Sequence, residues 1–94
     1  IYVTDAQQRI TEWLPGAAAV FGWTVDEALG QRSEILFTPE DRAAGVPDVE
    51  RETACRHGRA PNVRWHLRKD ASRVRIEGSV TALHDGAGRL QGFL

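Results

Sequence analysis

Residues 9–30 read RITEWLPGAAAVFGWTVDEALG, and this stretch decides the fold of the chain. It begins with a short β-rich run and continues into a helix of small residues that breaks at Gly22. A second helix follows, because Thr24 and Glu27 have the spacing of a capping box and Gly30 supplies the positive φ that ends such a helix. The stretch therefore predicts a strand followed by two short helices.

Working outward from this stretch, periodicity and turn residues predict five strands separated by several short helices. The predicted strands are residues 1–5, 9–13, 62–69, 74–82 and 90–94. Further helical segments are predicted at residues 31–37, after Thr38 with Pro39 at the first helical position, and at residues 48–57 before Gly58. The element order is two strands, several helices and three strands, which is an α+β fold.

The strand at residues 62–69 alternates with a period of two, so its side chains divide into two faces. Val63, Trp65 and Leu67 share one face, and Arg64, His66 and Arg68 share the other. We expect the apolar set to face the helices and the polar set to face outward. The expected fold depends on this orientation and on the strands being antiparallel.

The composition limits both the size of the protein and its partners. The chain has 94 residues, with 12 basic and 13 acidic side chains. This suits one domain, and the charge balance gives no reason to expect nucleic acid or membrane contact. Cys55 is the only cysteine, which excludes an internal disulfide and favours a cytoplasmic location. The chain starts and ends within predicted strands, so we expect a domain from a longer protein that could itself be membrane-anchored.

Several motifs, taken together and in this order, resemble the PAS domain, a sensory module of signalling proteins. They are DAQQRITEW at residues 5–13, FGWTVDEALG at 21–30, FTPEDR at 37–42, RWHLRKDAS at 64–72 and DGAGRLQGF at 85–93. The resemblance covers residues 1–94 as a single domain and implies a five-stranded antiparallel sheet with short helices packed on one face. Three positions depart from the family pattern: Leu14 replaces a capping asparagine, and Gln8 and Ala71 stand where turn glycines are usual.

The resemblance also implies a cavity between the sheet and the helices. The residues that map to its walls are Val20, Ile35, Leu36, Val49, Thr53, Val63, Trp65, Leu67, Ile76 and Val80. The same residues could fill an ordinary core, and we expect a filled, dry interior. Because Thr53 is the main polar member, a ligand there would be a small apolar or aromatic molecule.

Cofactors of the best-known PAS sensors are disfavoured at matching positions. Light-sensing members use a flavin-reactive cysteine in a G-x-N-C motif, and the matching run here ends in Ser33. The position of a haem-binding histidine falls near Gly45, and His57 is expected to interact with helix-terminal carbonyls. The spacing of His57, His66 and His84 predicts no metal site and no catalytic cluster. A non-covalent flavin or another planar ligand packed against Trp65 remains an alternative.

The outer sheet face is a candidate interface for a homodimer. Its predicted residues are Tyr2, Trp13, Arg64, His66, Arg68, Arg75 and Glu77, and the alternative is an ordinary solvated sheet face. The leading hypothesis is a PAS domain of a bacterial-type sensor histidine kinase that relays a signal by conformational change to an effector domain in the parent chain. A cofactor-binding sensor and a small α+β enzyme are the competing hypotheses.

Overall fold

The structure is a computed structural model that describes residues 2–94, so Ile1 of the predicted first strand lies outside the described residues. The strands are β1 (Tyr2–Asp5), β2 (Ile10–Trp13), β3 (Arg59–Leu67), β4 (Arg73–His84) and β5 (Leu90–Phe93). Between β2 and β3 lie α1 (Pro15–Phe21), α2 (Val25–Ala28), the 3₁₀ helix η1 (Ser33–Leu36), α3 (Pro39–Ala43) and α4 (Val46–His57). The predicted order of elements is confirmed.

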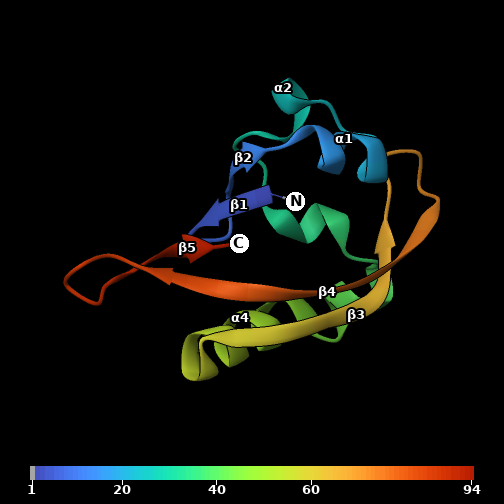
Figure 1. The fold of residues 1–94 in the computed structure, drawn as a ribbon. Helices are drawn as coiled ribbons and strands as arrows, with labels where there is room; N and C mark the ends of the chain where they lie inside the picture. The colour runs from blue at the N-terminus through green and yellow to red at the C-terminus, as the bar shows by residue number, and fades with distance from the viewer. Residues whose placement is uncertain (1) are drawn as a thin grey trace.

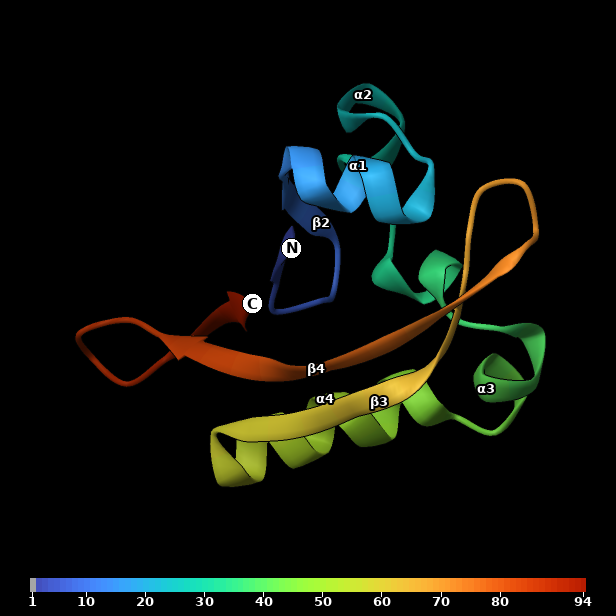
Figure 2. The ribbon, with the colours of Figure 1, turned by 45° about the vertical axis from the view of Figure 1, so that its right-hand side comes forward.

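The five strands form one sheet in the order β2-β1-β5-β4-β3, and every neighbouring pair is antiparallel. β3 and β4 are long and curved, whereas β1, β2 and β5 are short (Figure 1). α4 runs alongside β3 at one end of the molecule, and α1 and α2 lie near β2 at the other (Figure 2). This is the α+β arrangement that the family resemblance implies.

The helix boundaries follow the predicted local signals. The Thr24 hydroxyl accepts a hydrogen bond from the Glu27 amide, and the Glu27 carboxylate accepts one from the Thr24 amide, which completes the capping box. The Thr38 hydroxyl caps α3 by accepting from the Asp41 amide at 3.3 Å. At the start of α1, Leu14 provides no side-chain cap, as its replacement of asparagine predicts.

Two hairpin turns contain a left-handed residue that is not glycine. Gln8, between β1 and β2, has φ 65°, and Ala71, between β3 and β4, has φ 69°. Both residues stand at positions where the family pattern has glycine. The structure has the left-handed residue in both hairpins, so each turn carries a steric cost.

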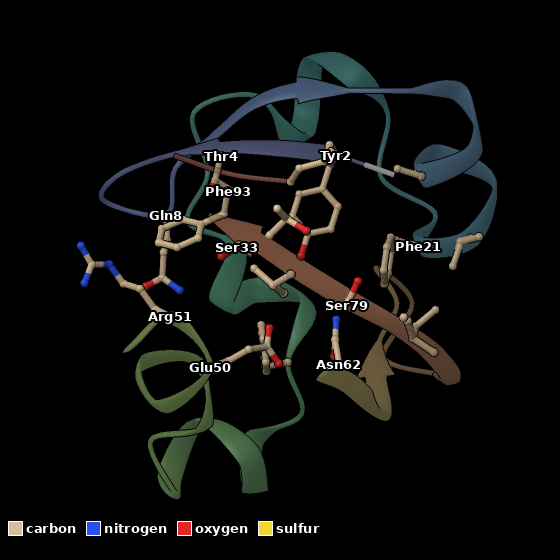
Figure 3. A pocket seen from close by; sticks show the side chains of 18 of the residues that line it. Tyr2, Thr4, Gln8, Phe21, Ser33, Glu50, Arg51, Asn62, Ser79 and Phe93 are labelled. Carbon is tan, nitrogen blue, oxygen red and sulfur yellow. The ribbon is translucent and has the colours of Figure 1, made fainter. Parts of the chain in front are cut away.

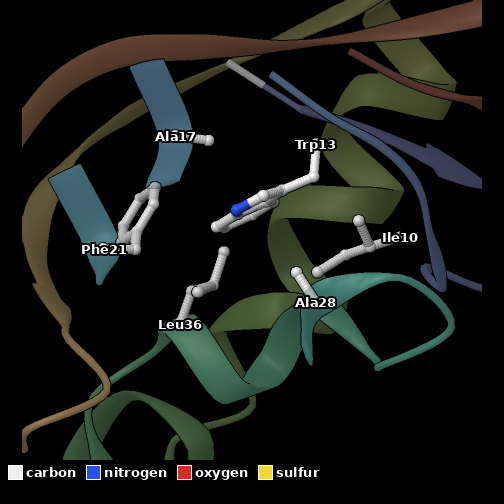
Figure 4. Packing of buried hydrophobic residues seen from close by; sticks show 6 residues of the cluster. All are labelled: Ile10, Trp13, Ala17, Phe21, Ala28 and Leu36. Atoms are coloured by element: carbon white, nitrogen blue, oxygen red, sulfur yellow. The ribbon is translucent and has the colours of Figure 1, made fainter. Parts of the chain in front are cut away.

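Buried apolar residues form two clusters. The first contains Ile10, Trp13, Ala17, Phe21, Ala28 and Leu36 (Figure 4), and the second contains Ala54, Ala60 and Phe93. Tyr2 packs against the first cluster, with its ring centroid 5.5 Å from that of Trp13. The prediction that Tyr2 and Trp13 lie on the outer face is therefore wrong.

An irregular register explains the error at β1 and β2. Tyr2 pairs with Trp13, Val3 with Glu12, and Thr4 with Ile10, so Thr11 is an extra residue in β2. Such a bulge interrupts the alternation of faces. Ile10 and Trp13 consequently both point inward although they are three positions apart.

The predicted orientation of β3 is also wrong. Val63 and Trp65 are 49% and 51% exposed, whereas Asn62 and His66 are buried. Pairing with β4 explains this, because residues directly opposite each other lie on the same face of the sheet. His66 pairs with Val74, which packs against the first cluster, and Trp65 pairs with exposed Arg75. The fold is nevertheless the expected one, so the family assignment does not depend on this face.

Candidate functional site

A cavity of about 490 Å³ lies between the two buried clusters and is drawn in Figure 3. This volume is in the range of small-molecule sites in proteins, so the expectation of a filled interior is wrong. Its lining comprises Tyr2, Thr4, Gln8, Ala17, Val20, Phe21, Ser33, Phe37, Glu50, Arg51, Asn62, Ile76, Glu77, Gly78, Ser79, Val80, Thr81, Phe93 and Leu94. The walls are contributed by α1, η1, α4 and four of the five strands, together with residues that follow or connect them.

The ten residues predicted for the cavity have different positions. Val20, Ile76 and Val80 line it, whereas Leu36 is fully buried in the first cluster, and Ile35 packs against that cluster. Thr53 and Leu67 are partly exposed and lie outside the lining.

Three more of the ten are wrong because they face solvent. They are Val49 on α4 and Val63 and Trp65 on β3, each at least 49% exposed. The orientation of β3 removed the two strand residues from the interior. Val49 lies on the exposed side of α4, next to Glu50 on its buried side.

Glu50 is the buried charged side chain of α4. Its side chain is only 7% exposed, and the Arg64 guanidinium approaches it with Nη2 3.1 Å from Oε2. The N–H direction does not make this contact a hydrogen bond, so Oε2 is buried without a hydrogen-bond partner. Burial raises the pKa of Glu50 to about 7, opposed by the Arg64 charge.

Two polar residues of β3 continue this arrangement. The Nε of Arg64 donates a hydrogen bond to Oδ1 of Asn62 at 3.1 Å, and Nε2 of His66 lies 2.9 Å from the same oxygen. Nδ1 of His66 donates to the Leu36 carbonyl at 2.8 Å, because a carbonyl oxygen can only accept. These contacts connect the α4 wall of the cavity to β3 and to the end of η1.

Burial controls the protonation of two further groups. It lowers the pKa of His66 below its usual range, although the hydrogen bond to Leu36 opposes this effect. Burial, and then the charge of Glu50, raise the pKa of Tyr2. Tyr2 therefore keeps its hydroxyl proton, and Figure 3 shows its ring entering the cavity from β1, opposite Glu50 on α4.

Comparison with known proteins decides the family. A family model described as the PAS fold matches residues 1–94. The chain belongs to the PAS family. PAS domains are typically sensory modules of signalling proteins, so this one is a signalling domain.

Several known proteins are similar to this PAS domain. Two-component system protein A of Emericella nidulans is 30% identical over 94 residues, which are the whole of this chain and 14% of that protein. A PAS domain from Colwellia psychrerythraea has a TM-score of 0.89 at 23% identity, over 98% of this chain and 77% of that one. A light-oxygen-voltage domain studied with a flavin analogue has a TM-score of 0.79 at 24% identity, over 98% of this chain and 70% of that one.

Residues at the cofactor positions of PAS sensors do not fit covalent flavin or haem chemistry. Ser33, which replaces the reactive cysteine, is buried at the cavity wall, and its hydroxyl cannot form the sulfur adduct. His66 lies outside the cavity lining, with Nδ1 donating to the Leu36 carbonyl and Nε2 2.9 Å from Oδ1 of Asn62. His57 and His84 are exposed and lie outside the cavity lining.

The competing enzyme hypothesis requires histidine, aspartate and serine side chains that converge in a cleft. The cavity lining contains no histidine, His57 and His84 are exposed, and His66 is buried outside the lining. Among residues 2–94, no group of three potential metal ligands is close enough to hold an ion. None of the helices in this part of the chain is long and apolar enough to span a membrane.

The predicted interface residues are divided between the two faces of the sheet. Arg75 and Glu77 are exposed on the outer face, as expected. Tyr2, Trp13, Arg64 and His66 point inward, so the prediction that they lie on the outer face is wrong. Arg68 is partly buried, and its Nε donates to the Val20 carbonyl at 3.1 Å, so it connects β3 to α1.

Sequence reasoning missed the polar part of the site. In the sequence, Glu50 falls within the predicted helix at residues 48–57, and the predicted cavity residues do not include Glu50, Asn62 or Tyr2. A usable signal was present in β4, where Val74, Ile76, Val80 and Ala82 fix the inward face. Extending that face across the hairpin would have placed Asn62, Arg64 and His66 inside.

Proposed function

We propose that this PAS domain is the sensory module of a sensor histidine kinase and that it responds to a small molecule held in the cavity. The observation that carries the proposal is the cavity itself, with an apolar lining and buried Glu50 in its wall. The similarity to a two-component system protein supports the type of pathway. Because this chain spans 14% of that relative, the kinase activity belongs to the proposal.

The contacts of Glu50 give a physical route for the signal. A ligand that contacts Glu50 changes its attraction to Arg64, which comes from β3. Arg64 lies between Val63 and Trp65 in sequence, and these two side chains are exposed on the other face of the same strand. A shift of β3 relative to α4 therefore alters the outer face and biases two arrangements of a dimer.

The outer sheet face is the proposed homodimer contact. Val63 and Trp65 supply apolar area there, and Arg75 lies with its guanidinium carbon 5.9 Å from the centre of the Trp65 ring. Apolar residues surrounded by charged side chains are common at protein interfaces. Sedimentation equilibrium of wild type and Trp65→Ser tests this, because a monomeric wild type would contradict it.

The remaining parts of the proposal concern the parent protein. We take residues 1–94 as one sensory unit whose effector domain lies elsewhere in a longer chain, with the unit in the cytoplasm. The single, unpaired cysteine supports a reducing compartment. The balanced charge supports action through protein contacts, with no nucleic acid and no membrane contact by this segment.

A second candidate is a sensor that binds flavin without a covalent bond. The fold similarity to a light-oxygen-voltage domain and the aromatic side chains in the cavity wall favour it. An absorption spectrum of freshly purified protein separates the two candidates. A visible flavin band would replace the first candidate, and a spectrum with only aromatic absorption would remove the second.

The proposal is tested by filling the cavity. Gly78 lines it, pairs with Asn62, and a Cβ added there meets only Ile76 Cγ2 at 4.0 Å. Gly78→Leu should fill the cavity and abolish ligand binding. The autophosphorylation rate of the full-length parent should then no longer change when ligand is added. Gly16→Leu is the matched control, because Gly16 is outside the lining and has no atom within 4 Å of an added Cβ. Signal responses that survive Gly78→Leu unchanged would refute the proposal.

A further inference from the structure

Two charged side chains of the described lining face the cavity, Glu50 and Arg51. Glu77 borders the cavity from β4, but its side chain is exposed on the outer face of the sheet. Arg51 is already engaged: its Nε and Nη2 donate to the Ala6 carbonyl at 3.2 and 3.1 Å, and its guanidinium lies over the Phe93 ring. The lining therefore offers no free cation to a phosphate or carboxylate group of a ligand.

Glu50 places a buried carboxylate in the α4 wall of the cavity. Glu50 is paired with Arg64, and Asp41 on α3 is near enough that its charge raises the pKa of Glu50 further. Oε2 of Glu50 has no hydrogen-bond partner among the described residues, so it can accept a hydrogen bond from a ligand. Arg64 also donates to Asn62, so it keeps a hydrogen bond when a second cation approaches Glu50. The site is electrostatically suited to receive one positive charge.

The rest of the wall is suited to an aromatic group. Tyr2, Phe21, Phe37 and Phe93 contribute rings from β1, α1, the end of η1 and β5. Figure 3 shows Tyr2, Phe21 and Phe93 on different sides of the space, with Glu50 extending from below. Aromatic side chains around a ring provide apolar contact and favourable edge-to-face geometry.

We propose that the cavity selects a small aromatic molecule that carries a protonated amine, whose ammonium group donates a hydrogen bond to the Glu50 carboxylate. The ring of this molecule packs among Tyr2, Phe21 and Phe93. The inference rests on the proposed function, because it names the ligand class of the same cavity. It excludes ligands that depend on an anionic group for binding.

Three probes of similar size and different charge test the inference: 2-phenylethylamine, 2-phenylethanol and phenylacetate, titrated calorimetrically at pH 8. A hydrogen bond to a charged group raises binding affinity about tenfold or more over a ligand that lacks the bond. We expect the amine to bind at least about tenfold more tightly than the alcohol, and phenylacetate to bind most weakly. In Glu50→Gln, the affinity for the amine should fall to that for the alcohol. Glu52→Gln, at an exposed position of the same helix, should leave the affinities for both probes unchanged.

The outcomes distinguish a failure of the amine inference from a failure of the proposal that the cavity binds a ligand. If the alcohol or phenylacetate binds as tightly as the amine and Gly78→Leu abolishes that binding, the amine inference is overturned and the sensory proposal stands. If none of the probes binds, both are overturned. If Glu50→Gln does not fold, the pH dependence of the wild type decides. The preference for the amine should then decrease as the pH is lowered through about 7, where Glu50 gains a proton, and a constant preference would overturn the inference.

Discussion

Ala71 is the residue at which a single substitution should most clearly stabilise the protein. It lies in the β3–β4 turn with φ 69° and is exposed, so Ala71→Gly removes no buried contact. A left-handed backbone costs an L-residue about 1–2 kcal/mol, whereas glycine adopts it freely. Glycine also gains about 0.4–1 kcal/mol of unfolded-state entropy, which opposes the benefit. The net gain is about 0.5–1 kcal/mol, or roughly 2–8 °C in Tm for a domain of this size.

The assay for Ala71→Gly is thermal unfolding followed by circular dichroism, with urea unfolding as a second measure of the free energy. Ala87→Gly is the control: Ala87 is an exposed alanine in the β4–β5 turn, outside the positive-φ residues. Ala87→Gly should lower the free energy of unfolding by about 0.4–1 kcal/mol, because glycine gives the unfolded chain more conformational entropy. A Tm for Ala71→Gly equal to or below that of the wild type would refute the reasoning, as would an equal rise for Ala87→Gly.

Three further predictions concern the faces of the sheet and the buried polar groups. Trp65→Ala should cost less than about 1 kcal/mol and Trp13→Ala about 3–5 kcal/mol in urea unfolding; similar costs would contradict the orientation of β3. His66→Leu should lower the free energy of unfolding by about 1–3 kcal/mol, because the Leu36 carbonyl loses its donor, whereas exposed His57→Leu should be near neutral. Burial raises the pKa of Glu50 from 4.5 to about 7, so the folded state holds a proton that the unfolded state releases. Stability should therefore fall by up to about 3 kcal/mol as the pH rises through this window, and a wild-type minus Glu50→Gln difference that stays flat would contradict it.

Much of the fold could be predicted from local signals. The capping box at Thr24 and Glu27, the Thr38 cap with Pro39, and the glycine after α4 each act within one turn of chain, so the sequence specifies them directly. The alternation of β3 also correctly identified which side chains share a face. These signals were sufficient to place all five strands and the helices between them.

The orientation of those faces could not be predicted from the same signals. Alternation divides β3 into two sets but does not state which set is inside, and hydrophobicity gave the wrong answer because Trp65 and Val63 are outward. The bulge at Thr11 similarly has no local signature and reversed the expectation for Trp13. Both errors arise from strand register, which depends on pairing between distant segments and not on propensity.

The inversion of β3 is informative about function. Placing Asn62 and His66 inside and Trp65 outside opposes the simplest burial of apolar area. Local rules and global structure usually agree, and their disagreements concentrate at functional sites. In this domain Arg64 of the inward set contacts Glu50 at the cavity wall, and the outward set lies on the proposed dimer face. One strand therefore has its polar side at the ligand site and its apolar side at the proposed contact, which explains why selection would keep an arrangement that burial alone disfavours.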